Sequence, residues 1–178
     1  SDWSKNIKIM GDKRMSNQGL SGKRLAGKIA VITGGAGGMG RAASQIFAAE
    51  GAKVAILDIA RKDGQETVAA IKAAGGEAVA SFEKVNDVAG AGRMVELALD
   101  NYGKLDILIN NAGTSVPELF DIQTLDQFRM LNEVHYLGTV YVTKAAWPHL
   151  TKVGGRLVNT ISEGPLGIHE RGTGYGGA

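Results

Sequence analysis

The sequence contains no cysteine, which excludes disulfide bonds and thiolate metal sites. The net charge over 178 residues is only +2, with no basic stripe, so we expect no nucleic-acid or membrane-surface partner. No apolar run is long enough to span a bilayer, and the N-terminus lacks the basic-then-apolar order of a secretory signal. His149 and His169 have no partner at metal-ligand spacing, so we expect no metal. These absences predict a cytoplasmic protein.

Glycine, by contrast, is abundant: 26 residues without a collagen period, placed where predicted elements end. Apolar runs predict parallel strands at residues 29–33, 54–57, 78–82, 105–109 and 156–161. Helical patterns separate them at residues 41–50, 63–74, 87–102 and 124–150. This alternation predicts an α/β fold, a right-handed doubly wound parallel (Rossmann) sheet with strand order 3-2-1-4-5. Its ligand crevice is expected at the carboxyl ends of the first and fourth strands.

Local signals predict where the helices begin and end. Asp63 with Glu66, and Thr124 with Gln127, resemble capping boxes, and Asp87 is a candidate N-cap. Pro148 is expected to kink or end the long helix at 124–150.

The chain is predicted to hold one dinucleotide-binding domain at residues 25–178. Residues 1–24 are expected to form a flexible arm. The first fourteen residues of this arm could be vector-derived, because Met15 is a candidate start.

A glycine-rich turn follows the first predicted strand and opens a helix. Glycines let the backbone approach a pyrophosphate without Cβ clashes, and the helix N-terminus offers free N–H groups. The candidate cofactor-binding residues in this turn are Thr33, Gly34, Gly38, Met39 and Gly40. The turn alone is equally a tight turn without a ligand, but its position between strand and helix favours a nucleotide site.

Asp58 ends the second strand about twenty residues after these glycines, as a dinucleotide fingerprint requires. Its carboxylate can accept hydrogen bonds from both adenosine-ribose hydroxyls and would repel a 2′-phosphate. NAD is therefore favoured over NADP, although Arg61 and Lys62 are close in sequence.

The pattern Thr-Gly-x-x-x-Gly-x-Gly at 33–40, with Asn-Asn-Ala-Gly at 110–113, resembles the short-chain dehydrogenase/reductase family. The resemblance covers residues 25–178 and implies an oxidoreductase that transfers a hydride between a nicotinamide cofactor and a secondary alcohol or ketone. It makes Asn111, Ala112, Gly113 and Val85 cofactor-binding residues. It also implies that Tyr175 is the general acid/base and that Ser162, thirteen positions earlier, hydrogen-bonds the substrate oxygen.

Three departures from the family pattern stand out. His135 replaces the usual Asn of the long helix; it is equally consistent with anchoring a proton-relay water and with simple packing. Together with Ala145-Ala146-Trp147 it resembles the (3R)-hydroxyacyl-CoA dehydrogenase branch, of 3-hydroxyacyl/3-oxoacyl type. Lys84 stands where the family has an Asp against adenine; it could relax the choice of cofactor, but a solvated surface lysine is the preferred interpretation. The family's catalytic Lys would be the residue after Ala178, and its usual C-terminal strands would follow, so the chain resembles a truncated member.

Two other interpretations remain open. One is a truncated, non-catalytic nucleotide-binding or interaction protein; the other is a relative of the nucleotide-sugar epimerases, against which the Asn-Asn-Ala-Gly segment argues. For the enzyme, residues 114–120 and 163–174 are expected to line the substrate pocket. The side chains taken to favour an apolar alcohol or ketone are Pro117, Leu119, Phe120, Leu166 and Ile168. The family resemblance also implies a homo-oligomer, a tetramer or dimer, packed through the helix at 124–150.

Overall fold

The computed structural model describes residues 23–162 and 172–178. Most of the predicted arm, and the pocket residues Leu166 and Ile168, lie outside the described part. Where the arm ends, Arg24 Nη2 lies 2.9 Å from Glu50 Oε1, which ties Arg24 to the end of the first helix.

A five-stranded parallel sheet with the order β3-β2-β1-β4-β5 forms the centre of the described residues. The strands are β1 (Ile29–Thr33), β2 (Lys53–Leu57), β3 (Glu77–Ser81), β4 (Ile107–Asn110) and β5 (Arg156–Asn159). The predicted fold class and strand order are confirmed. Each strand lies within one or two residues of its predicted range, because a short apolar run between glycine-rich turns has few other ways to be buried.

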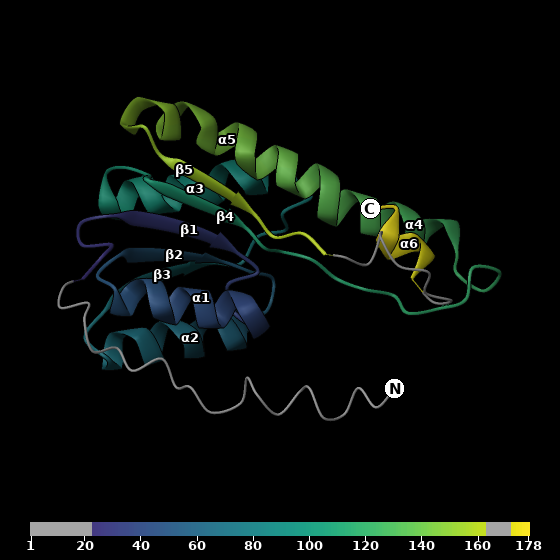
Figure 1. Cartoon of the computed structure of the whole chain (residues 1–178), viewed down its shortest axis with the longest axis horizontal. Coiled ribbons are helices and arrows are strands. Elements are labelled where there is room, and N and C mark those ends of the chain that lie inside the picture. Colours follow the sequence, from purple (N-terminus) through teal and green to yellow (C-terminus); the bar gives the residue numbers. More distant parts are fainter. Residues whose placement is uncertain (1–22, 163–171) are drawn as a thin grey trace, which may run out of the picture.

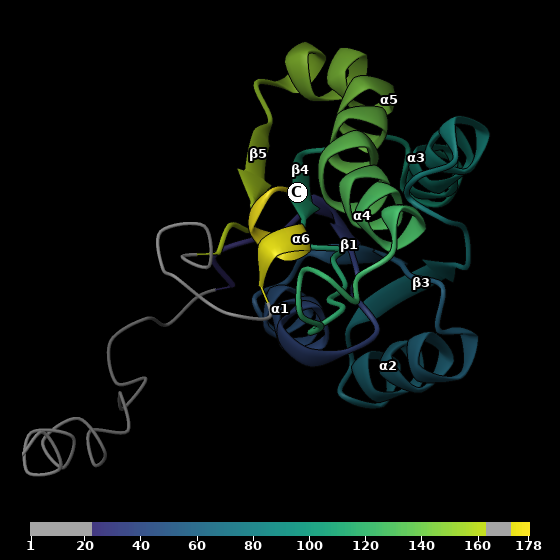
Figure 2. The same cartoon turned by 90° about the vertical axis from the view of Figure 1, so that its right-hand side faces the viewer.

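Helices cover both faces of the sheet, as Figure 2 shows. They are α1 (Gly38–Ala49), α2 (Arg61–Ala73), α3 (Val88–Tyr102), α4 (Leu125–Asn132), the π-helical turn η3 (Glu133–Leu137), α5 (Gly138–Val153) and the short α6 (Thr173–Gly176). Helices α1 and α2 lie on one face, and α3 and α5 on the other.

Alternate residues of the central strands enter the two cores. In β1, Val31 packs with Met94 and Val142 of the α3–α5 side, whereas Ile32 packs with Ile56 and Ile71 of the α1–α2 side. Burial of both strand faces follows from the continuous apolar runs. This rigid sheet fixes where the loops at its carboxyl edge emerge.

Several predicted helix boundaries are wrong. α1 begins at Gly38 rather than at Arg41, and α5 ends at Val153 rather than at Leu150. α2 begins at Arg61 rather than Asp63, and no side chain caps it, so the Asp63–Glu66 capping box does not form. The Asp58 carboxylate accepts the backbone N–H of Ala60, the residue that precedes the helix. Asp63 then lies within the helix, 3.6 Å from Arg41 Nη2.

The segment predicted as one helix over 124–150 is divided. Its N-terminal capping box is confirmed: Thr124 Oγ1 accepts from Gln127 N, and the Gln127 side chain accepts from Thr124 N. The π-helical turn η3 then interrupts the α-helical pattern before α5 begins. Pro148 does not end the helix, because α5 continues to Val153 and keeps Leu150 buried against the sheet.

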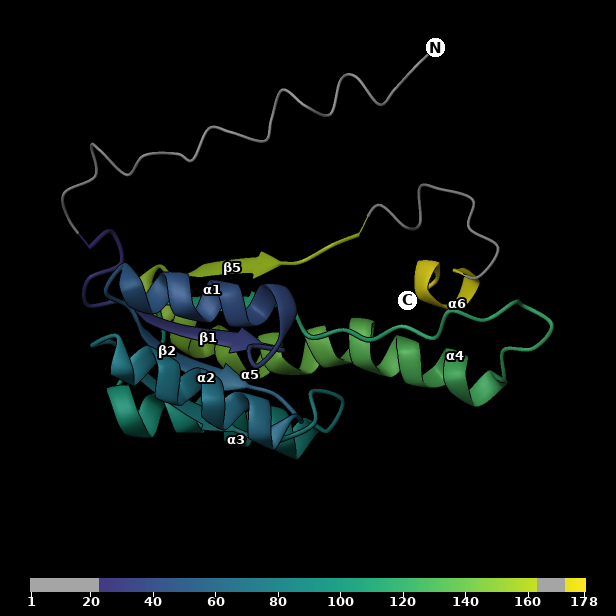
Figure 3. The same ribbon diagram turned by 90° about the horizontal axis from the view of Figure 1, so that it is seen from below.

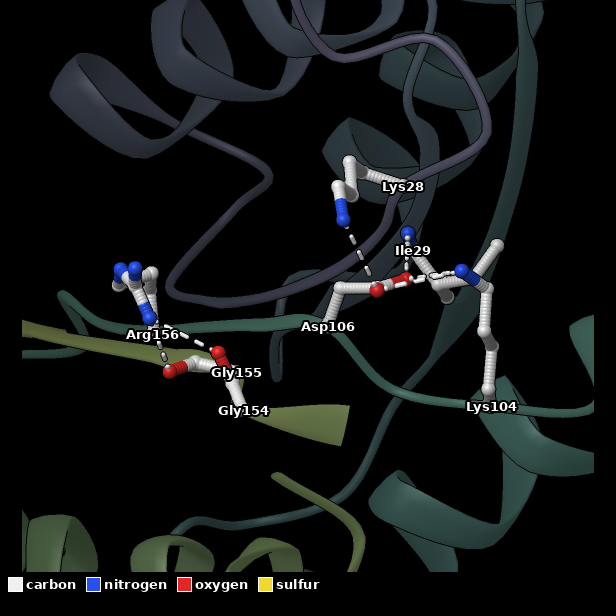
Figure 4. A network of polar contacts seen from close by, with 7 residues as sticks. All are labelled: Lys28, Ile29, Lys104, Asp106, Gly154, Gly155 and Arg156. Carbon is white, nitrogen blue, oxygen red and sulfur yellow. Dashed lines mark hydrogen bonds and ion pairs between the residues drawn. The ribbon is translucent and has the colours of Figure 1, made fainter. Parts of the chain in front are cut away.

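A buried carboxylate ties together the amino ends of β1 and β4 (Figure 4). Asp106 is 5% exposed and accepts the backbone N–H of Ile29 at 2.9 Å. Lys104 Nζ lies 2.9 Å and Lys28 Nζ 3.5 Å from its oxygens. Burial acts to raise the pKa of Asp106, but the hydrogen bonds from Lys104 and Ile29, together with both ammonium charges, lower it overall. The carboxylate therefore stays ionised at the end of the sheet opposite the glycine-rich turn.

Within residues 23–162 and 172–178, no helix is long and apolar enough to cross a membrane. The same residues hold no group of three or more His, Asp or Glu side chains placed to bind a metal ion. His169 lies outside the described residues.

Candidate active site

The carboxyl ends of β1 and β4 are joined by hydrogen bonds between their two loops. Thr33 Oγ1 accepts the backbone N–H groups of Asn111 and Ala112, both at 2.9 Å. The Asn111 amide in turn donates to Thr33 O at 3.2 Å and Gly34 O at 3.4 Å. This is the point where strand order reverses, the usual place for a ligand crevice in such sheets.

The glycine-rich turn passes too close to its neighbours for side chains. Gly34 has a φ of +63°, and a Cβ there would lie 2.9 Å from Ala112 Cα. A Cβ on Gly40 would collide with Gly34 O and lie 2.7 Å from the Asn111 amide nitrogen. Gly37, at the N-cap of α1, has nothing within 4 Å of its Cβ position. The backbone therefore leaves an open space in front of the N-terminus of α1.

A cleft of about 510 Å³ extends from this turn along the ends of β2 and β3. Its lining includes Asp58 and Val85, two of the candidate cofactor residues, together with Lys84 and Asn111 to Thr114. Val85 also packs closely on Gly138, where a Cβ would lie 2.8 Å from Val85 Cγ2. The cleft, the glycine-rich turn at its edge and the Asp58 carboxylate at the end of β2 together fit a dinucleotide.

Asp58 is held in place by backbone donors on both oxygens. Its Oδ2 accepts from Ala36 N and its Oδ1 from Ala60 N, both at 2.9 Å. Each carboxylate oxygen can accept a second hydrogen bond, so two ribose hydroxyls remain acceptable partners. The carboxylate is thus positioned before any ligand arrives.

The charge in this cleft is mainly negative. Asp63 and Glu83 line it beside Asp58, against one ammonium group, that of Lys84. The hydrogen bond from Arg93 lowers the pKa of Glu83, which keeps that carboxylate ionised. Arg61 does not line the cleft; its guanidinium lies over the Phe82 ring, 4.5 Å from the ring centre.

A second cleft of about 490 Å³ adjoins the first and shares Asn111, Ala112, Gly113 and Thr114 with it. Ser162, Tyr175 and His135, the three predicted catalytic residues, all line this cleft. Met39 also lines it with a side chain that is 70% exposed. The two adjoining clefts therefore bring the three predicted catalytic residues close to most of the predicted cofactor residues. Thr33, Gly38 and Gly40 line neither cleft, and the Thr33 hydroxyl instead holds the loop that carries Asn111.

His135 lies in the π-helical turn and contacts both the β4 loop and Tyr175. Its Nε2 is 2.7 Å from Thr114 O and 3.2 Å from Thr114 N. With a proton on Nε2 the ring donates to Thr114 O, and without one Nε2 accepts from Thr114 N, so the tautomer decides which of the two contacts is a hydrogen bond. The ring meets the Tyr175 ring edge to face, with centres 5.2 Å apart at 87°. Single π-helical turns inside α-helices often occur at functional sites.

Part of the predicted substrate pocket is not where the sequence placed it. Pro117, Leu119 and Phe120 do not line the second cleft. Phe120 instead packs edge to face on Phe128, with ring centres 6.0 Å apart. Thr114 and Ser115 are the residues of segment 114–120 that line the cleft.

Sequence reasoning missed a polar network behind the clefts. The Asn110 amide donates to Thr143 Oγ1 and to Asn159 Oδ1, both at 2.9 Å. Asn110 and Asn159 are register partners in β4 and β5, but the predicted ranges of these strands, 105–109 and 156–161, did not align the two residues. This network fixes the loop that carries Asn111.

Comparison with known proteins gives consistent matches. A family model described as short chain dehydrogenase matches residues 28–178. A meso-2,3-butanediol dehydrogenase of Serratia marcescens is 36% identical over 144 residues, which cover 81% of this chain and 57% of that enzyme. A peroxisomal hydratase-dehydrogenase-epimerase of Neurospora crassa is 35% identical over 153 residues, or 80% of this chain and 17% of that protein.

Solved structures agree with these matches. A 7α-hydroxysteroid dehydrogenase in complex with NADH and 7-oxo glycochenodeoxycholic acid superposes with a TM-score of 0.83 at 29% identity, covering 87% of this chain and 61% of that one. A short chain dehydrogenase of Burkholderia cenocepacia in complex with NADP gives 0.82 at 34% identity, covering 86% and 63%. The chain therefore spans less than two thirds of the length of these relatives.

Proposed function

Because the chain belongs to the short-chain dehydrogenase family, we propose that it is part of an NAD(P)-dependent oxidoreductase that interconverts a secondary alcohol and a ketone. The observation that carries this proposal is the adjoining pair of clefts. One has the shape and donors for a dinucleotide, and the other is lined by Ser162, Tyr175 and His135. A non-catalytic nucleotide-binding protein is not favoured by relatives that are named as dehydrogenases.

The roles of the three side chains follow from their chemistry. A nicotinamide cofactor held beside Asn111, Ala112 and Gly113 would supply the hydride acceptor for an alcohol or the hydride donor for a ketone. Tyr175 takes the hydroxyl proton of the alcohol, and Ser162 donates a hydrogen bond to the same oxygen. His135, whose ring can both donate and accept, holds a relay water that returns the Tyr175 proton to solvent.

For the cofactor we propose NAD rather than NADP. Asp58 lines the cleft with both of its oxygens oriented, so a 2′-phosphate beside it would meet like charge. The Arg61 guanidinium, which could offset that charge, lies over Phe82 instead. The other two carboxylates of the lining, Asp63 and Glu83, are paired with Arg41 and Arg93. The dinucleotide-binding residues are proposed as Thr33, Gly34, Gly38, Met39, Gly40, Asp58, Val85, Asn111, Ala112 and Gly113.

The substrate is proposed to be a small secondary alcohol or its ketone, and a 3-hydroxyacyl or 3-oxoacyl compound is one candidate.

We also propose that the protein is a homo-oligomer, a tetramer or dimer. Val140 and Trp147 on the outer side of α5 are exposed apolar residues, Trp147 by 54%, and a second subunit would bury them. The division into an arm at 1–24 and one domain at 25–178 is likewise proposed, and a cytoplasmic location stays a prediction.

A direct test incubates the purified protein with NAD⁺ and a panel of secondary alcohols, including 2,3-butanediol and a 3-hydroxyacyl thioester. The nicotinamide absorbance reports turnover in either direction, and a parallel titration measures NADH binding. Reduction of NAD⁺ by at least one alcohol supports the proposal. Tight NADH binding without turnover of any alcohol or ketone would instead favour a nucleotide-binding protein.

A further inference from the structure

Tyr175 owes its position to a very short helix. α6 spans only Thr173–Gly176, and it lies beside α4 in two perpendicular views (Figures 1 and 3). Four residues are too few for a helix to be stable by itself, so contacts with its neighbours must hold it. The contact with α4 therefore helps to place Tyr175, together with the edge-to-face contact between the Tyr175 and His135 rings.

Gln123, just before the N-cap of α4, provides a flat surface under α6. Its side chain is only 7% exposed, unusual for a glutamine outside a helix or strand. A Cβ on Gly174 would lie 2.6 Å from Gln123 Nε2, 2.8 Å from its Oε1 and 2.9 Å from Leu131 Cδ1. The buried Gly174 thus packs directly on the glutamine amide and on Leu131.

The glutamine is itself fixed from the loop side. Its backbone N–H donates to Leu119 O at 2.9 Å, and its Nε2 lies 3.5 Å from Val116 O. Its Oε1 is buried and has no hydrogen-bond partner among the described residues. The side chain therefore supports α6 by its shape rather than by a hydrogen bond.

We propose that Gln123 is a positioning residue that holds α6 against α4 through Gly174 and so sets the reach of Tyr175 into the second cleft. The proposal rests on the function proposed above, because it assigns Gln123 an effect on the acid/base group. It explains why residue 174, next to the tyrosine, has no side chain. It also makes position 123 a determinant of turnover although Gln123 does not line either cleft.

The test follows the tyrosine itself, independently of turnover. The chain has four tyrosines, so 3-fluorotyrosine labelling gives four ¹⁹F signals, and Tyr175→Phe identifies the one from Tyr175. In Gln123→Ala and in Gly174→Ala, we expect the Tyr175 signal to move towards that of free 3-fluorotyrosine while the other three stay in place. Gln123→Met keeps the length without the amide, so we expect a signal close to that of the unmodified chain.

A double variant separates the specific contact from general damage. In Gln123→Ala/Gly174→Ala, the shorter side chain at 123 leaves room for the new methyl group, and we expect the Tyr175 signal to return part of the way. Gln127→Ala is the matched control, because it weakens the cap of the same helix without touching Gly174. It should leave the Tyr175 signal unchanged.

Where turnover is measurable, Gln123→Ala should lower kcat about 100-fold while the KM for the cofactor stays within about twofold, as expected for a displaced catalytic group. A Tyr175 signal that is unchanged in Gln123→Ala and Gly174→Ala would overturn the positioning role, and so would an equal shift in Gln127→Ala. Shifts as expected, combined with no turnover by the unmodified protein, would leave the contact established and count against the proposed function alone.

Discussion

Asp58 is the residue on which the choice of cofactor depends. Its oxygens already accept the backbone N–H groups of Ala36 and Ala60, so the carboxylate is oriented without a ligand. Such preorganisation reduces the conformational entropy lost when a ribose binds. A single side chain can therefore contribute a large part of the preference for NADH.

We expect Asp58→Ala to narrow the ratio of the NADPH to the NADH dissociation constant by about tenfold or more, equivalent to about 1.4 kcal/mol. The physical reason is the loss of both the ribose acceptor and the charge that opposes a 2′-phosphate. Titration calorimetry with both cofactors measures the ratio. Asp100→Ala is a control, since this exposed acid lies on α3 and lines neither cleft. An unchanged ratio in Asp58→Ala would show that Asp58 does not determine the preference for NADH.

His135 can be tested with a substitution that preserves its ring contact. His135→Phe keeps an aromatic edge against Tyr175 but removes both ring nitrogens. If the imidazole holds a relay water, kcat falls about 10²–10⁴-fold, the range for lost acid–base catalysis. Steady-state kinetics at several pH values provide the measurement. Wild-type kcat in His135→Phe would mean that the residue only packs.

Among the elements, the glycine-rich turn offers a position where a substitution should weaken ligand binding without changing stability. Gly37 has open space around its Cβ position and an extended φ of −135°, so an alanine fits the protein. The added methyl group would project into the cleft that Gly37 lines. The turn therefore offers a substitution that blocks the ligand without disturbing the fold.

In Gly37→Ala we expect a free energy of unfolding within about 1 kcal/mol of wild type, since alanine is only a poorer N-cap than glycine. NADH affinity should fall by about tenfold or more, because the backbone can no longer approach the pyrophosphate. Urea unfolding and NADH titration measure the two quantities. Gly92→Ala, in an open position on α3, should leave NADH affinity unchanged. Equal NADH affinity in Gly37→Ala would argue against a phosphate site at this turn.

The elements also indicate how far the sequence could predict the structure. Strand ranges and order were predictable because buried runs such as Ile29–Thr33 have a single role in an alternating α/β chain. The start of α2 was not, because no side chain caps this helix and the capping-box pattern at Asp63 lies inside it. The π-helical turn was also missed, since one inserted residue barely alters a helical apolar pattern.

In the candidate site too, residues within local motifs were predictable and residues placed by distant contacts were not. Residues within motifs, such as Asn111 and Tyr175, were found from the sequence and meet at the clefts. Gln123 and Asn159 carry no motif, and their contacts depend on pairing between distant segments. Phe120 was misplaced because its hydrophobicity does not reveal that Phe128 is its partner.

At the scale of the whole molecule, the two ends of the sheet have different tasks. The carboxyl ends of β1 and β4 carry the clefts, whereas the amino ends are joined by the Asp106 network (Figure 4). The network lies at the far end of the same strands. Stability and binding should therefore respond separately to substitutions at the two ends.

We expect Asp106→Asn to lower the free energy of unfolding by about 1–3 kcal/mol at pH 7, because a buried charge-assisted hydrogen-bond network loses its charge. NADH affinity should remain within about twofold of wild type, consistent with additivity between distant sites. Asp126→Asn, at an exposed ion pair with Arg129, should have little effect. Loss of NADH affinity in folded Asp106→Asn would contradict the separation of tasks.

The Asp106 carboxylate should also account for part of the stability that the protein loses at low pH. Its folded pKa is lowered, so its contribution is complete above the unfolded value of about 3.9 and is lost as the pH falls through the folded pKa. Urea unfolding of the wild type should therefore show a loss of stability below about pH 4 that is smaller in Asp106→Asn. An identical acid limb in both proteins would contradict the assigned pKa shift.

We propose that hydride transfer takes place where the two clefts meet. The most direct measurement uses a secondary alcohol deuterated at its carbinol carbon, with NAD⁺, and follows the label by mass spectrometry of the nicotinamide. We predict deuterium on the reduced cofactor with the unmodified protein. Tyr175→Phe should give at least about 100-fold slower transfer, with NADH binding retained. Transfer at the wild-type rate in Tyr175→Phe, or deuterium released to water rather than to the cofactor, would contradict this account.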